Sequence, residues 1–152
     1  MQNKKSESGQ EYLFYQKLEY LLNPKDPLYK LAHKIPWEKL EKEFEKYYVD
    51  FGRPAKPTRL MISLLLLKQM YNKGDETVVE EWVHNPYWQY LSGEEVFKWE
   101  FPCDPSDLVH FRKRVGEEGI EKIFQMDLNI LCCTFSWKIN MNNYYSLISQ
   151  TD

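Results

Sequence analysis

The stretch DPSDLVHFRKRVG, residues 104–116, carries the side chains of this sequence best suited to contact a charged ligand. Asp104 can accept hydrogen bonds from the first turn of a helix, and Pro105 suits the first helical position because proline has no N–H to leave unpaired. Asp107 can bond back to the cap as in a capping box. Gly116 can adopt the left-handed conformation that ends a helix. The spacing therefore predicts a helix over 105–115.

This predicted helix has two unlike faces, because side chains advance by about 100° per residue. The apolar face contains Leu108, Phe111 and Val115, and the opposite face contains Ser106, His110, Lys113 and Arg114. A helix in a DNA major groove needs cations for phosphates and donors for base edges. The polar face therefore favours DNA contact, although an ordinary solvated basic face has the same composition. Arg112 lies beside the apolar stripe, so it could be structural and paired with an acid.

A second group of cations, Arg53, Lys56 and Arg59, flanks the start of another predicted helix and could bind phosphates. The whole chain of 152 residues has a formal net charge of −3, which is not typical of nucleic-acid-binding proteins. Any DNA binding must therefore come from local patches. We expect modest affinity with strong salt dependence.

Other chemistry has little support in the sequence. The cysteines (Cys103, Cys132 and Cys133) form no CxxC pair and the histidines (His33, His84 and His110) are scattered, so we expect no metal site. No nucleophile-elbow, P-loop, zinc-protease or dinucleotide motif is present. Ser106, Asp107 and His110 resemble a hydrolytic triad only by residue type. No signal segment is apparent, and the thiols fit a reducing cytoplasm.

Helical periodicity and caps predict the elements that would position these residues. Helices are expected over 11–22, 26–31, 36–48, 57–71, from Asp75 and from Asn85, with a last helix from Glu117. The 57–71 helix is apolar on nearly all sides and should lie at the centre of a bundle. Asp75 is expected to cap its helix, and Asn85 with Gln89 to form a capping box.

Two aromatic segments need a place in this fold. Trp37, Leu40, Phe44, Tyr47 and Tyr48 share one helix face, which is typical of core, with a dimer contact as the alternative. Residues 96–101 alternate with a period of two, so they are expected to form an extended connector pinned on the helices or a short edge strand. The predicted fold is an all-α helical bundle with a helix-turn-helix-like element and a short extended aromatic connector.

Residues 52–124 closely resemble the N-terminal domain of bacterial insertion-sequence transposases of the DDE class, in the group typified by insertion sequence five. The resemblance rests on Gly52-Arg53-Pro54 with Pro57, on VVEEWVHNPYWQYLSGE (78–94) and on PCDPSDLVHFRKR (102–114). It implies a domain that binds the terminal inverted repeats of a transposable element during DNA transposition and recombination.

The resemblance also implies what this chain lacks. In the family, three carboxylates hold two metal ions on a ribonuclease-H-like sheet that follows this domain. The chain shows no strand pattern for that sheet. Asp127 lies near the expected first carboxylate but within a helical pattern. We therefore expect no catalytic residue and no enzyme activity from this chain alone, and no cofactor, since Mg²⁺ would belong to the missing domain.

The expected organisation is N-terminal helices over 1–51, a transposase-like DNA-binding domain over 52–127 and an atypical tail over 128–152 that is frameshifted or disordered. The expected partner is double-stranded DNA carrying terminal inverted repeats, in the bacterial cytoplasm at the nucleoid. A homo-oligomer, or a mixed oligomer with full-length transposase, is the alternative role. In that role the aromatic faces would join protomers, and a truncated product would inhibit the full-length protein.

Overall fold

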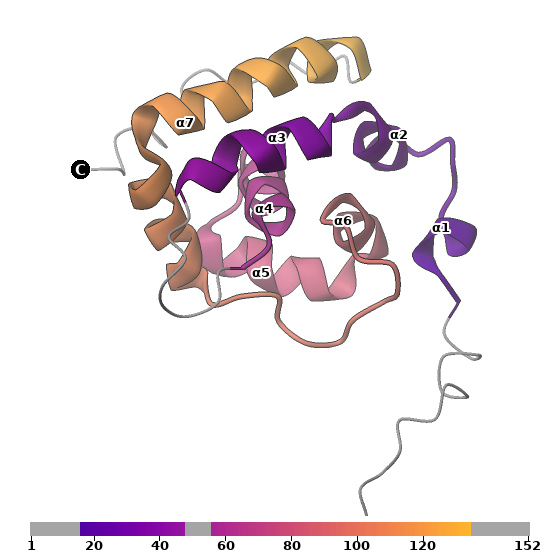
Figure 1. The fold of residues 1–152 in the computed structure, drawn as a ribbon. Coiled ribbons are helices and arrows are strands. Elements are labelled where there is room, and N and C mark those ends of the chain that lie inside the picture. Colours follow the sequence, from indigo (N-terminus) through magenta and orange to yellow (C-terminus); the bar gives the residue numbers. More distant parts are fainter. Residues whose placement is uncertain (1–15, 48–55, 135–152) are drawn as a thin grey trace, which may run out of the picture.

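The computed structural model describes residues 16–47 and 56–134, with side chains up to Gln125, and these ranges contain helices and no strand. The all-α prediction is therefore confirmed (Figure 1). The helices are α1 (Leu18–Leu21), α2 (Pro27–Lys34), α3 (Trp37–Phe44, followed by a 3₁₀ turn over Glu45–Tyr47), α4 (Thr58–Tyr71), α5 (Asp75–His84), α6 (Pro86–Leu91) and α7 (Pro105–Thr134). Among these residues no helix combines the length and apolar character needed to cross a bilayer.

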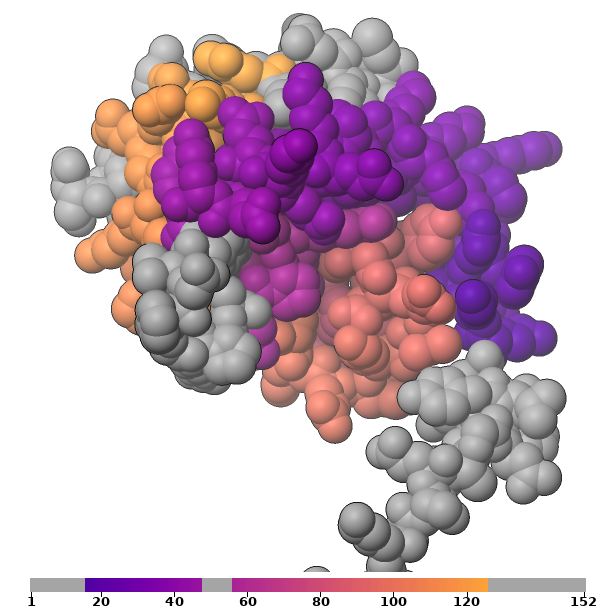
Figure 2. All heavy atoms as spheres, viewed as in Figure 1, coloured from indigo at the N-terminus to yellow at the C-terminus, as the bar shows by residue number. Residues whose placement is uncertain are grey.

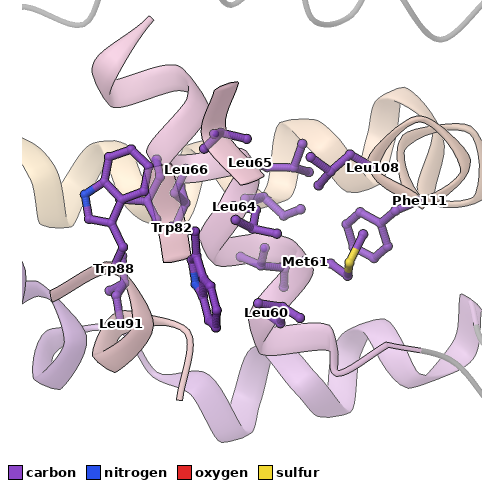
Figure 3. Close-up of a cluster of buried hydrophobic side chains, with 14 of the residues drawn as sticks. Leu60, Met61, Leu64, Leu65, Leu66, Trp82, Trp88, Leu91, Leu108 and Phe111 are labelled. Atoms are coloured by element: carbon purple, nitrogen blue, oxygen red, sulfur yellow. The ribbon is translucent and has the colours of Figure 1, made fainter. Parts of the chain in front are cut away.

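Helix α4 lies at the centre of the bundle, as its apolar sequence predicts (Figure 1). Every residue from Leu60 to Leu67 is buried, and α4 packs against α3, α5, α6 and α7. Trp82 from α5, Trp88 and Leu91 from α6, and Leu108 and Phe111 from α7 surround it (Figure 3). Burial of this many apolar side chains is the main force that assembles the helices.

The helices before residue 51 share this core with those after it. Leu31 of α2 and Leu40 and Phe44 of α3 belong to the same buried cluster as α4. Trp37 is also buried, and its indole donates to the Ala32 carbonyl at 2.9 Å. The prediction that the α3 aromatic stripe faces the core is confirmed for the described residues, whereas Tyr48 lies outside them.

Local caps explain several boundaries. The Asp26 carboxylate accepts from Leu28 N at 2.8 Å, and Asn85 Oδ1 accepts from the amides of Tyr87 and Trp88 at the start of α6. Asn72 ends α4 in a left-handed conformation with φ 52°. These starts and stops agree with the sequence predictions, because Asp and Asn compete well for unpaired amides and Asn tolerates positive φ.

Three local predictions are wrong. The first helix is only one turn within the described residues, and Leu21 is 57% exposed while Leu22 is buried. Here Leu18 N donates to the Glu95 carbonyl at 2.8 Å, which ties α1 across the fold. Asp75 is the first residue of α5, not its cap, because two cations bind its carboxylate. Gln89 makes no capping box and is fully buried.

Gln89 instead holds the connector between α6 and α7, residues 92–104. Its Oε1 accepts from Lys98 N at 2.7 Å, and its Nε2 donates to the Lys98 carbonyl at 2.8 Å. The connector is thus pinned on the helices by a buried amide, and it forms no edge strand. Trp99 and Phe101 are 78% and 65% exposed, so these two rings do not hold the connector. The connector is longer than the short turn of a compact helix-turn-helix.

Helix α7 bends sharply at Gly116, so the two predicted helices form one bent element (Figure 1). Gly116 has φ 69° and ψ −179°, a conformation available almost only to glycine. Beyond the bend, Ile120, Ile123 and Phe124 are buried as predicted. The backbone stays helical through Thr134, past the boundary expected at residue 127, and residues 135–152 lie outside the described part.

We predict that Gly116→Ala lowers the free energy of unfolding by about 1–3 kcal/mol, because an L-residue is strained at this φ and ψ. No neighbouring atom lies within 4 Å of an added Cβ, so steric contact would not contribute. Urea denaturation of both proteins measures the change. Glu117→Ala, at the adjacent exposed position, is the control and should change stability little. Equal stability of the two variants would show that the bend does not need glycine.

Candidate nucleic-acid interface

The segment of α7 before the bend presents the two faces predicted from its sequence. Leu108, Phe111 and Val115 are buried, and the first two are seen to point into the core around α4 (Figure 3). The opposite face is exposed along its whole length; it consists of Ser106, His110, Lys113 and Arg114. The structure therefore brings these four predicted residues together on one solvent-facing surface, which we call the outer face.

The start of this helix is held by the predicted capping box. Asp104 N donates to Asp107 Oδ2 at 3.1 Å, and Ser106 N donates to Asp104 Oδ1 at 2.8 Å. The Ser106 hydroxyl also donates to Asp104 Oδ1, at 2.5 Å. Ser106 and Asp107 are thus engaged in the cap, which does not favour the hydrolytic-triad interpretation. The carboxylates of Asp104 and Asp107 at the start of α7 repel phosphates. The cationic end of the outer face, which carries Lys113 and Arg114, is therefore the better site for DNA.

Arg112 is the cation that turns inward. It is 2% exposed, and its Nη1 and Nη2 donate to Asp75 Oδ1 and Oδ2, both at 2.8 Å. Lys68 Nζ donates to Asp75 Oδ1, also at 2.8 Å. This ion-pair cluster (Lys68, Asp75 and Arg112) joins α4, α5 and α7 and fixes the rotation of α7, so that the outer face points to solvent. It confirms the structural role considered for Arg112.

The electrostatics of Asp75 follow from these contacts. Burial alone would raise the pKa of its carboxyl, but hydrogen bonds and charge attraction from Arg112 and Lys68 outweigh burial and hold the pKa below its ordinary value. Asp75 is therefore charged near neutral pH. The Arg112 Nε atom is buried with no hydrogen-bond partner among the described residues, so the guanidinium depends on Asp75 for nearly all of its compensation.

The second predicted cation group is engaged elsewhere. Lys56 Nζ donates to the Pro102 carbonyl at 2.9 Å, which anchors the connector just before α7. Arg59 Nε donates to the Leu91 carbonyl at 3.0 Å, and its guanidinium lies 4.6 Å from the Trp37 ring centroid. Burial lowers the pKa of Arg59 below its ordinary value. Arg53 lies outside the described residues.

A groove that no sequence pattern indicates lies beside the start of α7. This acidic groove has a volume of about 540 Å³ and is lined by Lys56, Glu76, Val79, Glu80, Phe101, Cys103, Asp104, Pro105 and Asp107. Burial raises the pKa of the Cys103 thiol to about 11, so the thiol is neutral. No set of three His, Cys, Asp or Glu side chains in the described part of the chain could hold a metal ion. The groove suits a cationic side chain and disfavours nucleic acid.

Comparison with known proteins identifies the family to which this chain belongs. The family model described as Transposase domain (DUF772) matches residues 16–114, and the chain belongs to this transposase-domain family. A relative from Rhizobium meliloti, described as uncharacterized protein ORF8 in the nfe locus, is 42% identical over 125 residues, which is 82% of this chain and 60% of that protein. The chain thus spans about three fifths of the length of this curated relative. No solved structure matches the chain.

We predict that Asp75→Asn destabilises the fold by about 3 kcal/mol, because it leaves the Arg112 guanidinium buried without a counter-charge. Chemical denaturation followed by circular dichroism measures the loss. Glu80→Gln makes the same chemical change at an exposed position of α5 and should have little effect. If Asp75→Asn were as stable as wild type, the ion-pair cluster would not hold α7 in place.

The ion-pair cluster also makes the stability of the fold depend on pH. Since the pKa of Asp75 is lower in the folded state than in the unfolded chain, its contribution is fully present above the unfolded pKa of about 4. The contribution is lost as the pH falls through the folded value. Wild-type stability should therefore fall more steeply below about pH 4 than that of Asp75→Asn. Parallel acid dependences in the two proteins would contradict this assignment.

Proposed function

We propose that this chain is the DNA-binding N-terminal portion of an insertion-sequence transposase of the DDE class, in the group typified by insertion sequence five. It would recognise the terminal inverted repeats of its element in DNA transposition. The observation that carries the proposal is the outer face of α7. This helix is docked rigidly on the core, and it exposes His110, Lys113 and Arg114 to solvent. Membership of the transposase-domain family supports it.

The outer face can contact DNA in a specific way. Lys113 and Arg114 can bind phosphates, and Arg114 or His110 can reach base edges in a major groove. Docking through Leu108, Phe111 and the ion-pair cluster removes most of the freedom of α7, so little ordering is needed on binding. Ser106 would have to accept hydrogen bonds from DNA, because its own proton is used in the cap.

We assign different roles to the other predicted cations. Lys56 and Arg59 bind backbone carbonyls, so we propose that they position the connector and α6 and do not contact phosphates. A phosphate contact by Arg53 stays a prediction. The carboxylate of Glu117 follows Arg114 by three residues, which limits the number of phosphates that can approach the cationic end of the outer face. We therefore expect modest affinity.

We propose that the chain alone does not catalyse strand transfer. The resemblance to DDE transposases assigns that reaction to three carboxylates and Mg²⁺ in a further domain. We carry none of those carboxylates over to this chain. A role in transposition would also place the protein at the bacterial nucleoid, in the cytoplasm.

We predict that Lys113→Ala and Arg114→Ala each weaken binding to terminal-repeat DNA about tenfold, since a lost base or phosphate contact costs about 1–3 kcal/mol. Gel shifts at two salt concentrations give affinity and salt slope, and each lost phosphate contact should reduce the slope by about 0.9. Lys30→Ala, an exposed lysine of α2, is the matched control. Equal affinity of the wild type for repeat and random DNA would remove the sequence-specific proposal.

Arg59 provides a discriminating variant. We predict that Arg59→Met lowers stability by about 1–2 kcal/mol, because it removes the bond to the Leu91 carbonyl and the charge over Trp37. The salt slope of DNA binding should stay the same, since no phosphate contact is lost. If the salt slope of DNA binding is reduced under conditions in which the variant is fully folded, Arg59 belongs to the DNA interface.

A further inference from the structure

One ridge of the α7 outer face points directly away from the core. The inward direction of the helix is set by its buried stripe of Leu108, Phe111 and Val115. Because successive residues turn by about 100° around a helix axis, Ser106, His110 and Lys113 lie within about 50° of the opposite direction. All three are exposed, and the orange atoms of α7 reach the surface of the molecule in Figure 2. We call these three residues the central ridge.

The two arginines of this segment point elsewhere. Arg112 turns inward, where it is 2% exposed and binds Asp75. Arg114 lies about 80° around the axis from Ser106, on the same flank as Asp107. When a helix lies in a major groove, its outermost side chains face the base edges and its flanks face the phosphates. The central ridge therefore has the direction suited to bases, and Arg114 has the direction suited to a phosphate.

The central ridge is ordered by hydrogen-bond chemistry along the helix. The Ser106 hydroxyl donates its proton to Asp104 Oδ1 at 2.5 Å, so the Ser106 oxygen is left to accept. The Lys113 ammonium group only donates, and the His110 imidazole has at least one N–H to donate. No hydrogen bond or ion pair to another described residue engages the side chain of His110 or Lys113. The ridge thus accepts near its start and donates toward its end.

The spacing of the two donors fits neighbouring base pairs. His110 and Lys113 are three residues apart, which is about 4.5 Å along a helix axis, compared with about 3.4 Å per base-pair step. In the major groove guanine offers two acceptors, O6 and N7, on one edge, whereas the amino groups of adenine and cytosine donate. Donors at both positions therefore favour guanines. The accepting oxygen of Ser106, one helical turn earlier, favours an amino group.

We propose that His110 and Lys113 determine base specificity by donating hydrogen bonds to guanines on adjacent base pairs in the major groove. Ser106 accepts a hydrogen bond from the amino group of an adenine or cytosine, and Arg114 binds a phosphate at the groove wall. This inference rests on the proposed function, because it takes duplex DNA as the ligand of the outer face. It adds which bases are recognised and which side chains recognise them.

Selection by the full chain from a pool of DNA duplexes with a randomised centre tests the assignment. Wild type should enrich duplexes with guanines at two adjacent base pairs. Replacing either G·C pair by A·T should weaken binding about tenfold, because adenine lacks the O6 acceptor. Hypoxanthine paired with cytosine has the major-groove edge of guanine and should bind as G·C does, which controls for contacts in the minor groove.

Variants then assign each base pair to a side chain. His110→Ala should become insensitive to one of the two A·T replacements, and Lys113→Ala to the other. Arg114→Ala should weaken binding to all duplexes by the same factor and keep both base preferences. Lys30→Ala, an exposed lysine of α2, is the control and should select and bind as wild type does.

The outcomes separate this inference from the proposed function. If duplexes bind without a guanine preference, or if His110→Ala and Lys113→Ala keep the wild-type preference, the base assignment is overturned and DNA binding stands. Loss of a base preference in Arg114→Ala, or weaker binding to the hypoxanthine duplex, would overturn it in the same way. If no duplex binds wild type at low salt, the proposed function fails and the base assignment fails with it.

Discussion

The ion pair between Asp75 and Arg112 is the contact on which the candidate interface depends. An arginine at 2% exposure is costly unless its charge is matched, and the two bonds of 2.8 Å to one carboxylate match it. Because Lys68 binds the same carboxylate, three helices are linked at one point. Apolar contacts alone would allow α7 to rotate or slide, whereas paired bonds in fixed geometry allow one rotation.

This constraint divides three consecutive basic residues between two roles. Arg112 turns inward and orients the helix, while Lys113 and Arg114 stay at the surface. The inward residue determines where the other two point. Lys56 and Arg59 are also used for internal contacts. Each donates a hydrogen bond to a backbone carbonyl, although both lie in a stretch of sequence that resembles a basic patch. A count of cations along the sequence therefore overstates the charge available to a nucleic acid.

Elements with strong local signals could be predicted from the sequence. The burial of α4, the two faces of α7 and the caps at Asp26 and Asn85 follow from periodicity and from the chemistry of short polar side chains. The capping predictions for Asp75 and Gln89 are wrong because each residue fits a local capping pattern yet has a stronger partner outside its own helix. The acidic groove leaves no sequence signal for the same reason, since its walls come from α5, the connector and α7. Spacing within a segment carries no information about such partners.

The bend at Gly116 makes the two ends of the domain depend on one helix. Before the bend, α7 packs against α4 and α5; after it, Lys122 pairs with Glu43 of α3 at 3.3 Å. The family match ends at residue 114, yet the buried cluster extends to Phe124. A domain boundary drawn at residue 114 would therefore remove the part of α7 that covers α3. The buried core thus extends about ten residues beyond the segment that the family model matches.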